Sequence, residues 1–330
     1  MIRRRNADLP DLNGLLVVDK PVGFTSHDVV ARVRRMTGMK RVGHAGTLDP
    51  FATGVLVIAV GRTTRLLQYV QDTDKGYRAE VILGIETDSG DVDGAVVRQL
   101  PVDPWPTRAA IELCLEQFLG RIEQFPPIYS AIKVDGQKLY ALARAGKPVE
   151  APMRVVLIHS IEVVAYEPPS LTIDVRCGKG TYIRSLARDI GVALGTTGYC
   201  HTLRRTAVGQ FGIANAWLLS DLDEMDARKR WSDVALAPDA AVAGLPAQVL
   251  SAEEATAWYY GRSIRVTDRP VDGTIQRVYA KDGSFVGLGE FGEGQVLRPV
   301  LVFPAVTPNE CAASLEPVTQ NSVIRKDNND

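Results

Sequence analysis

A carboxylate in a glycine-punctuated turn is the first group in this chain whose setting could do chemistry. Asp49 lies within the segment 43–54, directly before the apolar run 55–60. Glycine adopts backbone angles that other residues resist, and Pro50 biases the residue before it towards an extended conformation. A carboxylate displayed on a rigid turn beside a buried strand can act as a nucleophile or as a base. A Leu-Asp-Pro turn is nevertheless common, so the turn by itself favours a structural aspartate.

Two basic stretches could bind a polyanion. The net charge of the chain is −1, yet local patches can neutralise phosphates even in a near-neutral protein. The segment 32–41 carries five Lys and Arg residues and no acid, and the segment 133–147 carries four with Asp135 as its only acid. Solvated charges on a helix and a loop are the alternative for each stretch.

The composition is that of a globular protein of two domains, with 330 residues, 45% hydrophobic and 23% charged. No run of about 18 uncharged apolar residues is present, and the basic N-terminal segment lacks the apolar core of a secretory signal. The four cysteines and four histidines show no metal-ligand spacing. We therefore expect a cytoplasmic protein in a reducing compartment, without a membrane span, a disulfide framework or a metal site.

A basic helix is predicted immediately before the Asp49 turn. After a short buried strand over 15–18, Thr25 and Asp28 have the spacing of a helix capping box, and Gly38 ends the helix. Apolar side chains share one face of this helix and arginines lie on the other. The helix therefore presents a basic surface next to the turn.

Two half-buried strands are predicted in the middle of the chain, over 77–83 and 171–177, because apolar and polar residues alternate there. Prolines in the segment 125–130 exclude a regular helix and begin a loop-rich insertion that extends to about Pro152. The second strand leads through the glycine loop 178–181 into a helix. This order lacks the spacing of a phosphate-binding P-loop, which argues against an NTPase.

The C-terminal part of the chain predicts a small β-domain. A break rich in Ala and Pro falls over 235–246, and Ser251 with Glu254 forms a second capping box. Four short β-like segments separated by Gly and Asp turns follow, at 263–266, 274–280, 284–287 and 296–303. The segment from about Thr307 to Asp330 is polar and aperiodic and is expected to be disordered.

The order of these segments resembles the TruB family of tRNA pseudouridine synthases. The resemblance covers about residues 11–304, and several separate motifs in one order make it specific. The matching motifs are residues 14–21, 23–26, 42–50, 52–54, 75–77, 87–91, 124–127, 129–134, 180–184 and 203–205.

The resemblance implies an α+β protein with the pseudouridine synthase fold, in which a mixed, largely antiparallel sheet carries a central cleft. A small PUA-like RNA-binding β-domain would follow. The expected domains are a flexible N-terminus over 1–10, a catalytic domain over 11–246 with an RNA-gripping insertion at about 124–152, the PUA-like domain over 250–304, and a disordered tail over 305–330.

The resemblance also implies a reaction, the isomerisation of uridine 55 in the T loop of tRNA to pseudouridine. The base leaves the ribose, turns and rejoins it through carbon, so no cofactor is expected. The expected partner is the T arm of tRNA, with no obligatory protein partner, and the chain is expected to be a monomer. Asp49 is the implied catalytic carboxylate, ionised at neutral pH. Attack on the ribose C1′, addition to the uracil ring and help in removing a ribose proton all stay open as its role.

The other catalytic residues are implied by the same motifs. Arg184 would pair with Asp49, favour its charged form and orient it; without the motif, a surface arginine is the simpler interpretation. Tyr77 would stack on the target base and move a proton, and Tyr182 and Leu203 would line the base pocket. Each of these three residues also suits an ordinary core position.

The remaining implied contacts are with the RNA. Because the reactive face of a stacked uridine is hidden, the enzyme should extrude the nucleotide, and His44 would lie close to it. Lys20 is also expected to bind the substrate. Arg32, Arg35 and Lys133 would grip the RNA backbone, which positions the substrate more than it specifies the sequence.

Two other functions stay open. One is an RNA-binding or RNA-folding protein with a vestigial site, although the presence of Asp49, Tyr77 and Arg184 argues against a dead site. The other is a guide-dependent rRNA pseudouridylase, which would need partner proteins. The short C-terminal domain favours a stand-alone enzyme instead.

Overall fold

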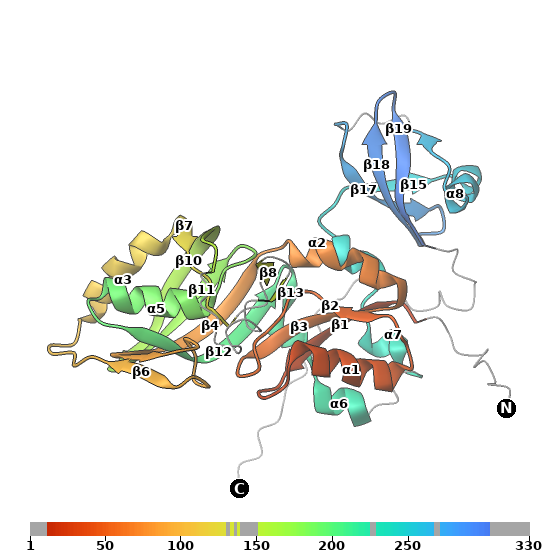
Figure 1. Cartoon of the computed structure of the whole chain (residues 1–330). Helices are drawn as coiled ribbons and strands as arrows, with labels where there is room; N and C mark the ends of the chain where they lie inside the picture. The colour runs from red at the N-terminus through yellow and green to blue at the C-terminus, as the bar shows by residue number, and fades with distance from the viewer. Residues whose placement is uncertain are drawn as a thin grey trace, which may run out of the picture. The chain divides into compact units, whose positions relative to one another are not determined.

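The computed structural model describes residues 12–129, 133–134, 137–138, 151–224, 229–266 and 271–303. The chain divides into two compact units between Val242 and Ala243, and Figure 1 traces both. The expected flexible N-terminus (1–10) and disordered tail (305–330) lie outside the described residues, as does most of the insertion expected at 124–152.

The first unit alternates strands with short helices, of which those marked η are 3-10 helices. Its elements are β1 (Gly14–Lys20), α1 (Ser26–Thr37), β2 (Val42–His44), β3 (Thr53–Val60), η1 (Gly61–Leu66), α2 (Leu67–Gln71), β4 (Lys75–Leu83), β5 (Ile85–Thr87), β6 (Val96–Gln99), α3 (Arg108–Leu115), η2 (Glu116–Phe118), β7 (Gly120–Gln124), β8 (Lys133–Val134), β9 (Gln137–Lys138), β10 (Arg154–Glu167), β11 (Ser170–Cys177), α5 (Ile183–Ala193), β12 (Gly198–Val208), β13 (Phe211–Gly212), η3 (Ile213–Asn215), β14 (Trp217–Leu218), α6 (Leu219–Glu224), α7 (Trp231–Val234) and η4 (Pro238–Val242).

One large mixed sheet organises this unit. Its strands lie in the order β14-β1-β3-β12-β4-β11-β10-β7, and β2 and β13 pair with β3 and β12 beside that path. The pairs β1–β14 and β3–β12 are parallel. By contrast, β4 pairs antiparallel with both β11 and β12, and β10 does so with both β7 and β11. The predicted α+β class with a mixed, largely antiparallel sheet is confirmed.

Two hydrophobic cores lie against this sheet. One packs α3 and α5 against β4, β10, β11 and β12, and the other packs α1, α6 and α7 against β1 and β3. Figure 1 shows the two groups of helices over different halves of the sheet. Leu48 and Phe51 of the Asp49 turn are buried in the first core, although the strands flanking the turn contribute to the second. Each such burial contributes about 1.5–3 kcal/mol, so the turn is fixed to the half that carries α5.

The predicted basic helix is α1, and its ends form as the sequence predicts. The Thr25 hydroxyl accepts a hydrogen bond from the Asp28 backbone N–H, and the Asp28 carboxylate accepts one from the Thr25 backbone N–H. Gly38 ends the helix in the left-handed conformation with φ of 71°. The helix buries its valines and leaves its arginines on the opposite side.

The second unit is the predicted small β-domain. Its strands lie in the order β15-β17-β18-β19-β16, and Trp258 is fully buried, with its indole N–H donating to the Val286 carbonyl at 3.1 Å. The predicted capping box of Ser251 and Glu254 begins its helix. The elements are β15 (Ala247–Leu250), α8 (Ala252–Tyr259), β16 (Ile264–Arg265), β17 (Ile275–Ala280), β18 (Phe285–Gly292) and β19 (Val296–Val302).

Gly54 allows β3 to pass close to β12 directly after the Asp49 turn. Its φ is +103°, and a Cβ at this position would lie 2.2 Å from the carbonyl oxygen of Arg205. The Arg205 backbone cannot move aside to relieve this contact, as the end of a flexible side chain could. The glycine is therefore required by a close approach of two strands as well as by its own backbone angle.

We expect Gly54→Ala to lower the free energy of unfolding of the first unit by more than the control Gly120→Ala. Both glycines have a positive φ, +103° and +80°, but a Cβ at Gly120 would meet nothing within 4 Å. Backbone strain of about 1–3 kcal/mol is common to both variants, so the excess in Gly54→Ala measures the contact with Arg205. Urea unfolding of the full chain gives the comparison. Equal losses would show that this contact does not constrain the strand.

Candidate active site

The turn that carries Asp49 joins β2 to β3 and directs the carboxylate away from the core. Leu48 and Phe51, on either side of Asp49, are 4% and 8% exposed, whereas the Asp49 side chain is 34% exposed. The Ala52 backbone N–H donates to the Asp49 carbonyl at 3.1 Å and closes the turn. Two buried anchors thus hold one accessible carboxylate between them.

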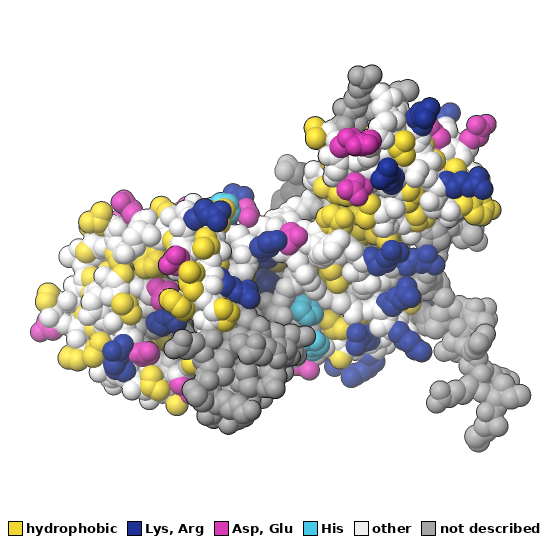
Figure 2. All heavy atoms as spheres, turned by 45° about the horizontal axis from the view of Figure 1, so that its top comes forward, with side chains coloured by type: hydrophobic (Ala, Val, Ile, Leu, Met, Phe, Trp, Pro, Cys, Tyr) yellow, Lys and Arg dark blue, Asp and Glu magenta, His cyan; other side chains and the backbone are white. Residues whose placement is uncertain are grey.

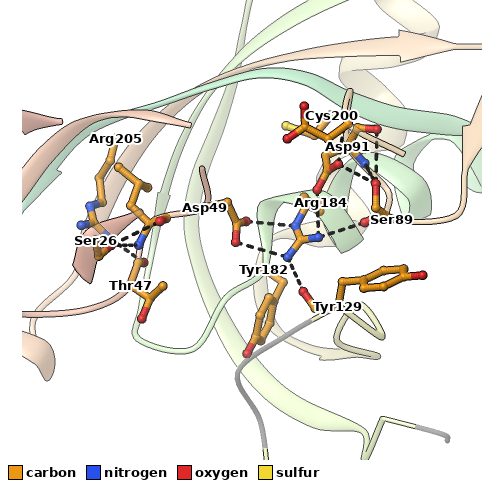
Figure 3. Close-up of polar contacts among 12 residues, drawn as sticks. Ser26, Thr47, Asp49, Ser89, Asp91, Tyr129, Tyr182, Arg184, Cys200 and Arg205 are labelled. Carbon is orange, nitrogen blue, oxygen red and sulfur yellow. Dashed lines mark hydrogen bonds and ion pairs between the residues drawn. The ribbon is translucent and has the colours of Figure 1, made fainter. Parts of the chain in front are cut away.

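Arg184 of α5 pairs with this carboxylate. Its Nε lies 3.0 Å from Oδ2 of Asp49, and its side chain is only 5% exposed. Figure 3 shows the guanidinium between two carboxylates, those of Asp49 and Asp91, with Nη1 of Arg184 3.0 Å from Oδ2 of Asp91. The surface location that the sequence favoured in the absence of a motif is therefore wrong for Arg184.

Two backbone carbonyls also accept hydrogen bonds from the Arg184 guanidinium. Nη1 of Arg184 donates to the Ser89 carbonyl at 2.9 Å, and Nη2 donates to the Tyr129 carbonyl at 2.8 Å. Asp91 is itself held, because it accepts hydrogen bonds from the Ser89 hydroxyl at 2.5 Å and from the Asp93 backbone N–H at 3.2 Å. Arg184 has little freedom to rotate, so the direction in which it holds Asp49 is set before any substrate binds.

Opposing electrostatic effects act on Asp49. Burial raises the pKa of its carboxyl group, because the charged form is poorly solvated, and the charge of Asp91 raises it further. The Arg184 guanidinium opposes this rise, and Lys20 does so more weakly. Arg184 therefore favours the ionised carboxylate in a setting that would otherwise favour the neutral acid.

Lys20 is buried beside the Asp49 turn, and its expected role in binding the substrate stays a prediction. Its side chain is fully buried, and its ammonium donates to the carbonyls of Pro21 at 2.9 Å, Phe24 at 2.7 Å and Pro50 at 3.3 Å. Burial lowers the pKa of this amine to about 8. All three ammonium protons have carbonyl acceptors, so Lys20 ties the loop before α1 to the Asp49 turn.

Tyr77 and Leu203 lie on the neighbouring strands β4 and β12 and share the first core with the turn. Leu203 is 6% exposed, and Tyr77 packs against the same cluster as Leu48 and Phe51. Burial raises the pKa of the Tyr77 phenol, so this group is neutral at physiological pH. The structure therefore brings Tyr77 and Leu203 into the core that holds the Asp49 turn.

Tyr182 caps the start of α5, two residues before Arg184. Its backbone N–H donates to the Gln124 side chain at 2.8 Å, and its carbonyl accepts from the same side chain at 3.0 Å. Figure 3 places the Tyr182 side chain beside the Asp49–Arg184 pair. The double hydrogen bond with Gln124 fixes the backbone from which both Tyr182 and Arg184 extend.

His44 lies on β2 at the start of the turn, next to His27. The two imidazole rings meet edge to face, with centroids 5.5 Å apart. Burial, followed by the charge of His27, lowers the pKa of His44. A hydrogen bond with the Gly46 backbone opposes this fall in the pKa, so His44 is tied to the turn that follows it.

The candidate RNA-backbone residues differ in their settings. Arg32 forms a two-pronged ion pair with Asp223 and is 40% exposed, so much of its charge is already neutralised. Arg35 is exposed on the same helix. Lys133 belongs to β8, and its side chain lies outside the described part of the chain. Figure 2 shows one group of Lys and Arg side chains near His side chains, with further Lys and Arg side chains spread over the rest of this face.

Sequence reasoning missed two residues of the site. Asp91 and Arg205 lie within motifs that were recognised, but no role was expected for either. The alternation of β12 could have revealed Arg205, because Leu203 and Arg205 point to one side of the strand and Arg204 to the other. Arg205 is 1% exposed, whereas Arg204 pairs with Asp19 and has a side chain that is 43% exposed.

Among the residues that the structure describes, no three His, Cys, Asp or Glu side chains gather as a metal site would require. Cys114, Cys177 and Cys200 are free thiols. None of the described helices is long and apolar enough to cross a membrane.

Three family models match this chain in succession. They are the TruB family pseudouridylate synthase N-terminal domain over residues 34–183, the tRNA pseudouridylate synthase B C-terminal domain over 184–252, and the pseudouridine synthase II TruB C-terminal region over 246–303.

Curated relatives named tRNA pseudouridine synthase B align over most of the chain. The protein from Trichormus variabilis is 42% identical over 299 residues, which span 90% of this chain and 100% of that relative. The protein from Azoarcus sp. is 45% identical over 289 residues, which span 87% of this chain and 94% of that relative.

Solved structures with a similar fold confirm the fold of this chain. The structure of an H/ACA RNP bound to a substrate RNA containing 2′-deoxyuridine has a TM-score of 0.68 at 24% identity and covers 92% of this chain and 94% of that chain. A Cbf5-Nop10-Gar1 complex has a TM-score of 0.66 at 26% identity and covers 88% of this chain and 84% of that chain. The family models, the relatives and the Asp49-centred motifs agree: the chain belongs to the TruB family of pseudouridylate synthases.

Proposed function

We propose that this chain isomerises a uridine in the T loop of tRNA, uridine 55 by family resemblance, to pseudouridine, with Asp49 as the catalytic carboxylate. The observation that carries the proposal is the accessible Asp49 carboxylate held 3.0 Å from the buried guanidinium of Arg184. The relatives named tRNA pseudouridine synthase B support the substrate.

The proposed reaction balances within the substrate. The bond between N1 of uracil and C1′ of ribose breaks, the base turns, and a bond forms between C5 and C1′. C5 loses a proton and N1 gains one, so no electrons enter or leave. An ionised Asp49 could attack C1′, add to the ring or assist loss of a ribose proton, and each of these roles uses the same accessible oxygen atoms.

Arg184 and Asp91 serve the reaction through Asp49. A guanidinium presents its N–H groups in a rigid plane, so a carboxylate paired with it is held in one orientation. Asp91, whose side chain is 8% exposed, occupies the other edge of Arg184. The pair Arg184–Asp91 is thus a positioning device that also favours the charged form of Asp49.

Tyr77 and Leu203 would receive the extruded base. Flipping a nucleotide out of folded RNA costs a few kcal/mol, which stacking against aromatic and apolar side chains offsets. His44, at the start of the Asp49 turn, would contact the flipped nucleotide, and the basic helix α1 would contact RNA phosphates. These backbone contacts would contribute affinity that falls with salt.

We expect Asp49→Asn to slow turnover by at least about 10³-fold, because an amide can neither attack as a carboxylate nor accept a proton as one. Release of tritium from C5-labelled uridine in a T-arm hairpin measures turnover, and filter binding measures RNA affinity, which should stay close to that of the unmodified chain. Asp174→Asn is the control, because Asp174 pairs with Arg78 at an exposed position. Tritium release by Asp49→Asn at the rate of Asp174→Asn would overturn the assignment.

The pH profile gives a second prediction. Because burial raises the pKa of Asp49, kcat/KM should fall with decreasing pH at a higher pH than for an ordinary aspartate of pKa about 3.9. Arg184→Met removes the charge that opposes this rise, so the acid limb of the profile should move to still higher pH. Arg188→Met, four residues further along α5, should leave the limb in place. A limb that stays fixed or moves down in Arg184→Met would argue against an essential ionised Asp49.

The purified full chain should convert a T-arm hairpin without guide RNA or another protein, and it should do so as a monomer. Conversion is read by tritium release, and the oligomeric state by light scattering of the same sample. Strict dependence on an added guide RNA would favour the guide-dependent alternative. RNA binding without any tritium release would favour an RNA-folding protein instead.

A further inference from the structure

Arg205 is a buried cation whose hydrogen-bond acceptors are backbone carbonyls of the Asp49 turn. It lies on β12 and is 1% exposed. Nε donates to the Val55 carbonyl at 2.7 Å, Nη1 to the Thr47 carbonyl at 3.3 Å and Nη2 to the Gly46 carbonyl at 3.3 Å. A buried charge is costly unless it is hydrogen-bonded, and these three carbonyls meet that requirement.

The three acceptors lie on both sides of the catalytic carboxylate. Gly46 and Thr47 precede Asp49, and Val55 follows it. One rigid guanidinium therefore holds the two arms of the turn at a fixed separation. Figure 3 shows Arg205 on the side of Asp49 opposite to Arg184, so the turn is gripped through its backbone by one arginine and through its carboxylate by the other.

The glycines of the turn fit around Arg205. A Cβ at Gly54 would lie 2.2 Å from the Arg205 carbonyl oxygen, and a Cβ at Gly46 would lie 3.8 Å from Nη1 of Arg205. Gly46 also has a φ of +95°, which turns the chain so that its carbonyl reaches the guanidinium. The backbone and the side chain of Arg205 thus both lie against the turn.

Strand register places Arg205 between the two segments that carry the proposed chemistry. Arg205 pairs with Gly54 of β3 on one side and with Tyr77 of β4 on the other. The positive charge of Arg205 and a side-chain hydrogen bond from it oppose the rise in the pKa of Tyr77. A guanidinium has donors only, so the phenol oxygen is the acceptor in this hydrogen bond.

We infer that Arg205 is a positioning residue for the proposed isomerisation, which fixes the Asp49 turn and the Tyr77 phenol relative to each other through one guanidinium. The inference rests on the proposed function. Arg205 acts through its hydrogen bonds to the backbone of the turn and to the phenol. It acts by holding both groups in the geometry that the flipped base must meet.

The test uses Arg205→Lys in the full chain, because lysine keeps the charge but cannot donate to three carbonyls in one plane and to the phenol. Single-turnover rates are measured by tritium release at saturating enzyme, RNA affinity by filter binding, and folding by thermal unfolding. The rate should fall by about 10²-fold, the cost of a displacement of about 1 Å, while RNA affinity and cooperative unfolding persist. Arg78→Lys is the matched control, since Arg78 follows Tyr77 on β4 but forms an exposed pair with Asp174; it should react at the unmodified rate.

A double-mutant cycle with Tyr77→Phe provides the readout that a merely structural role would not give. Residues in contact show coupled effects, whereas independent ones add. Arg205→Lys should therefore reduce the rate less on the Tyr77→Phe background than on the unmodified one. Additive effects, an unmodified rate in Arg205→Lys, or failure of Arg205→Lys to fold would each overturn the inference. Absence of tritium release from the unmodified chain would instead overturn the proposed function itself.

Discussion

The site depends on one guanidinium shared between two carboxylates. Arg184 is almost fully buried, and Asp49 and Asp91 each lie 3.0 Å from one of its nitrogens. Removing one partner of a buried ion pair typically costs about 3–5 kcal/mol, because the other charge is left uncompensated. Asp91 is buried and bonded on all sides, whereas Asp49 stays accessible. One edge of the guanidinium is thus paired with a buried carboxylate, and the other edge with a carboxylate that solvent can reach.

Patterns among neighbouring residues were enough to predict many of the helix ends and strands. Capping boxes at Thr25 and Ser251, alternating strands and a glycine stop at Gly38 depend on neighbours in sequence, and the structure reproduces each of them. The family motifs identified Asp49 and Arg184 as a pair, although 135 residues of sequence separate them. Composition and periodicity alone would have left Arg184 on the surface, because its helical position lies off the apolar stripe.

The settings of Lys20 and Arg205 could not be predicted, because their hydrogen-bond acceptors are brought close only by the tertiary structure. The side chains of Lys20 and Arg205 donate hydrogen bonds to backbone carbonyls of the Asp49 turn. The pattern of side chains in a sequence does not indicate which carbonyls of a turn lack a backbone donor. The expected role of Lys20 in binding the substrate stays a prediction, and the structure adds that its ammonium holds backbone carbonyls before α1 and at Pro50. Its burial follows from the route of the loop before α1, which becomes known only when the packing of the sheet is known.

The turn that bears Asp49 belongs to the core of α3 and α5 through Leu48 and Phe51, while its flanking strands belong to the core of α1. This division has a consequence for the protein as it is made. Residues up to the turn leave the ribosome long before α5 and β12, which supply Arg184 and Arg205. Until β12 has been made, the Asp49 carboxylate lacks its ion pair with Arg184 or its turn lacks the hydrogen bonds from Arg205. The surroundings of Asp49 are therefore completed late in synthesis, because the sheet pairs the early strand β3 with the late strand β12.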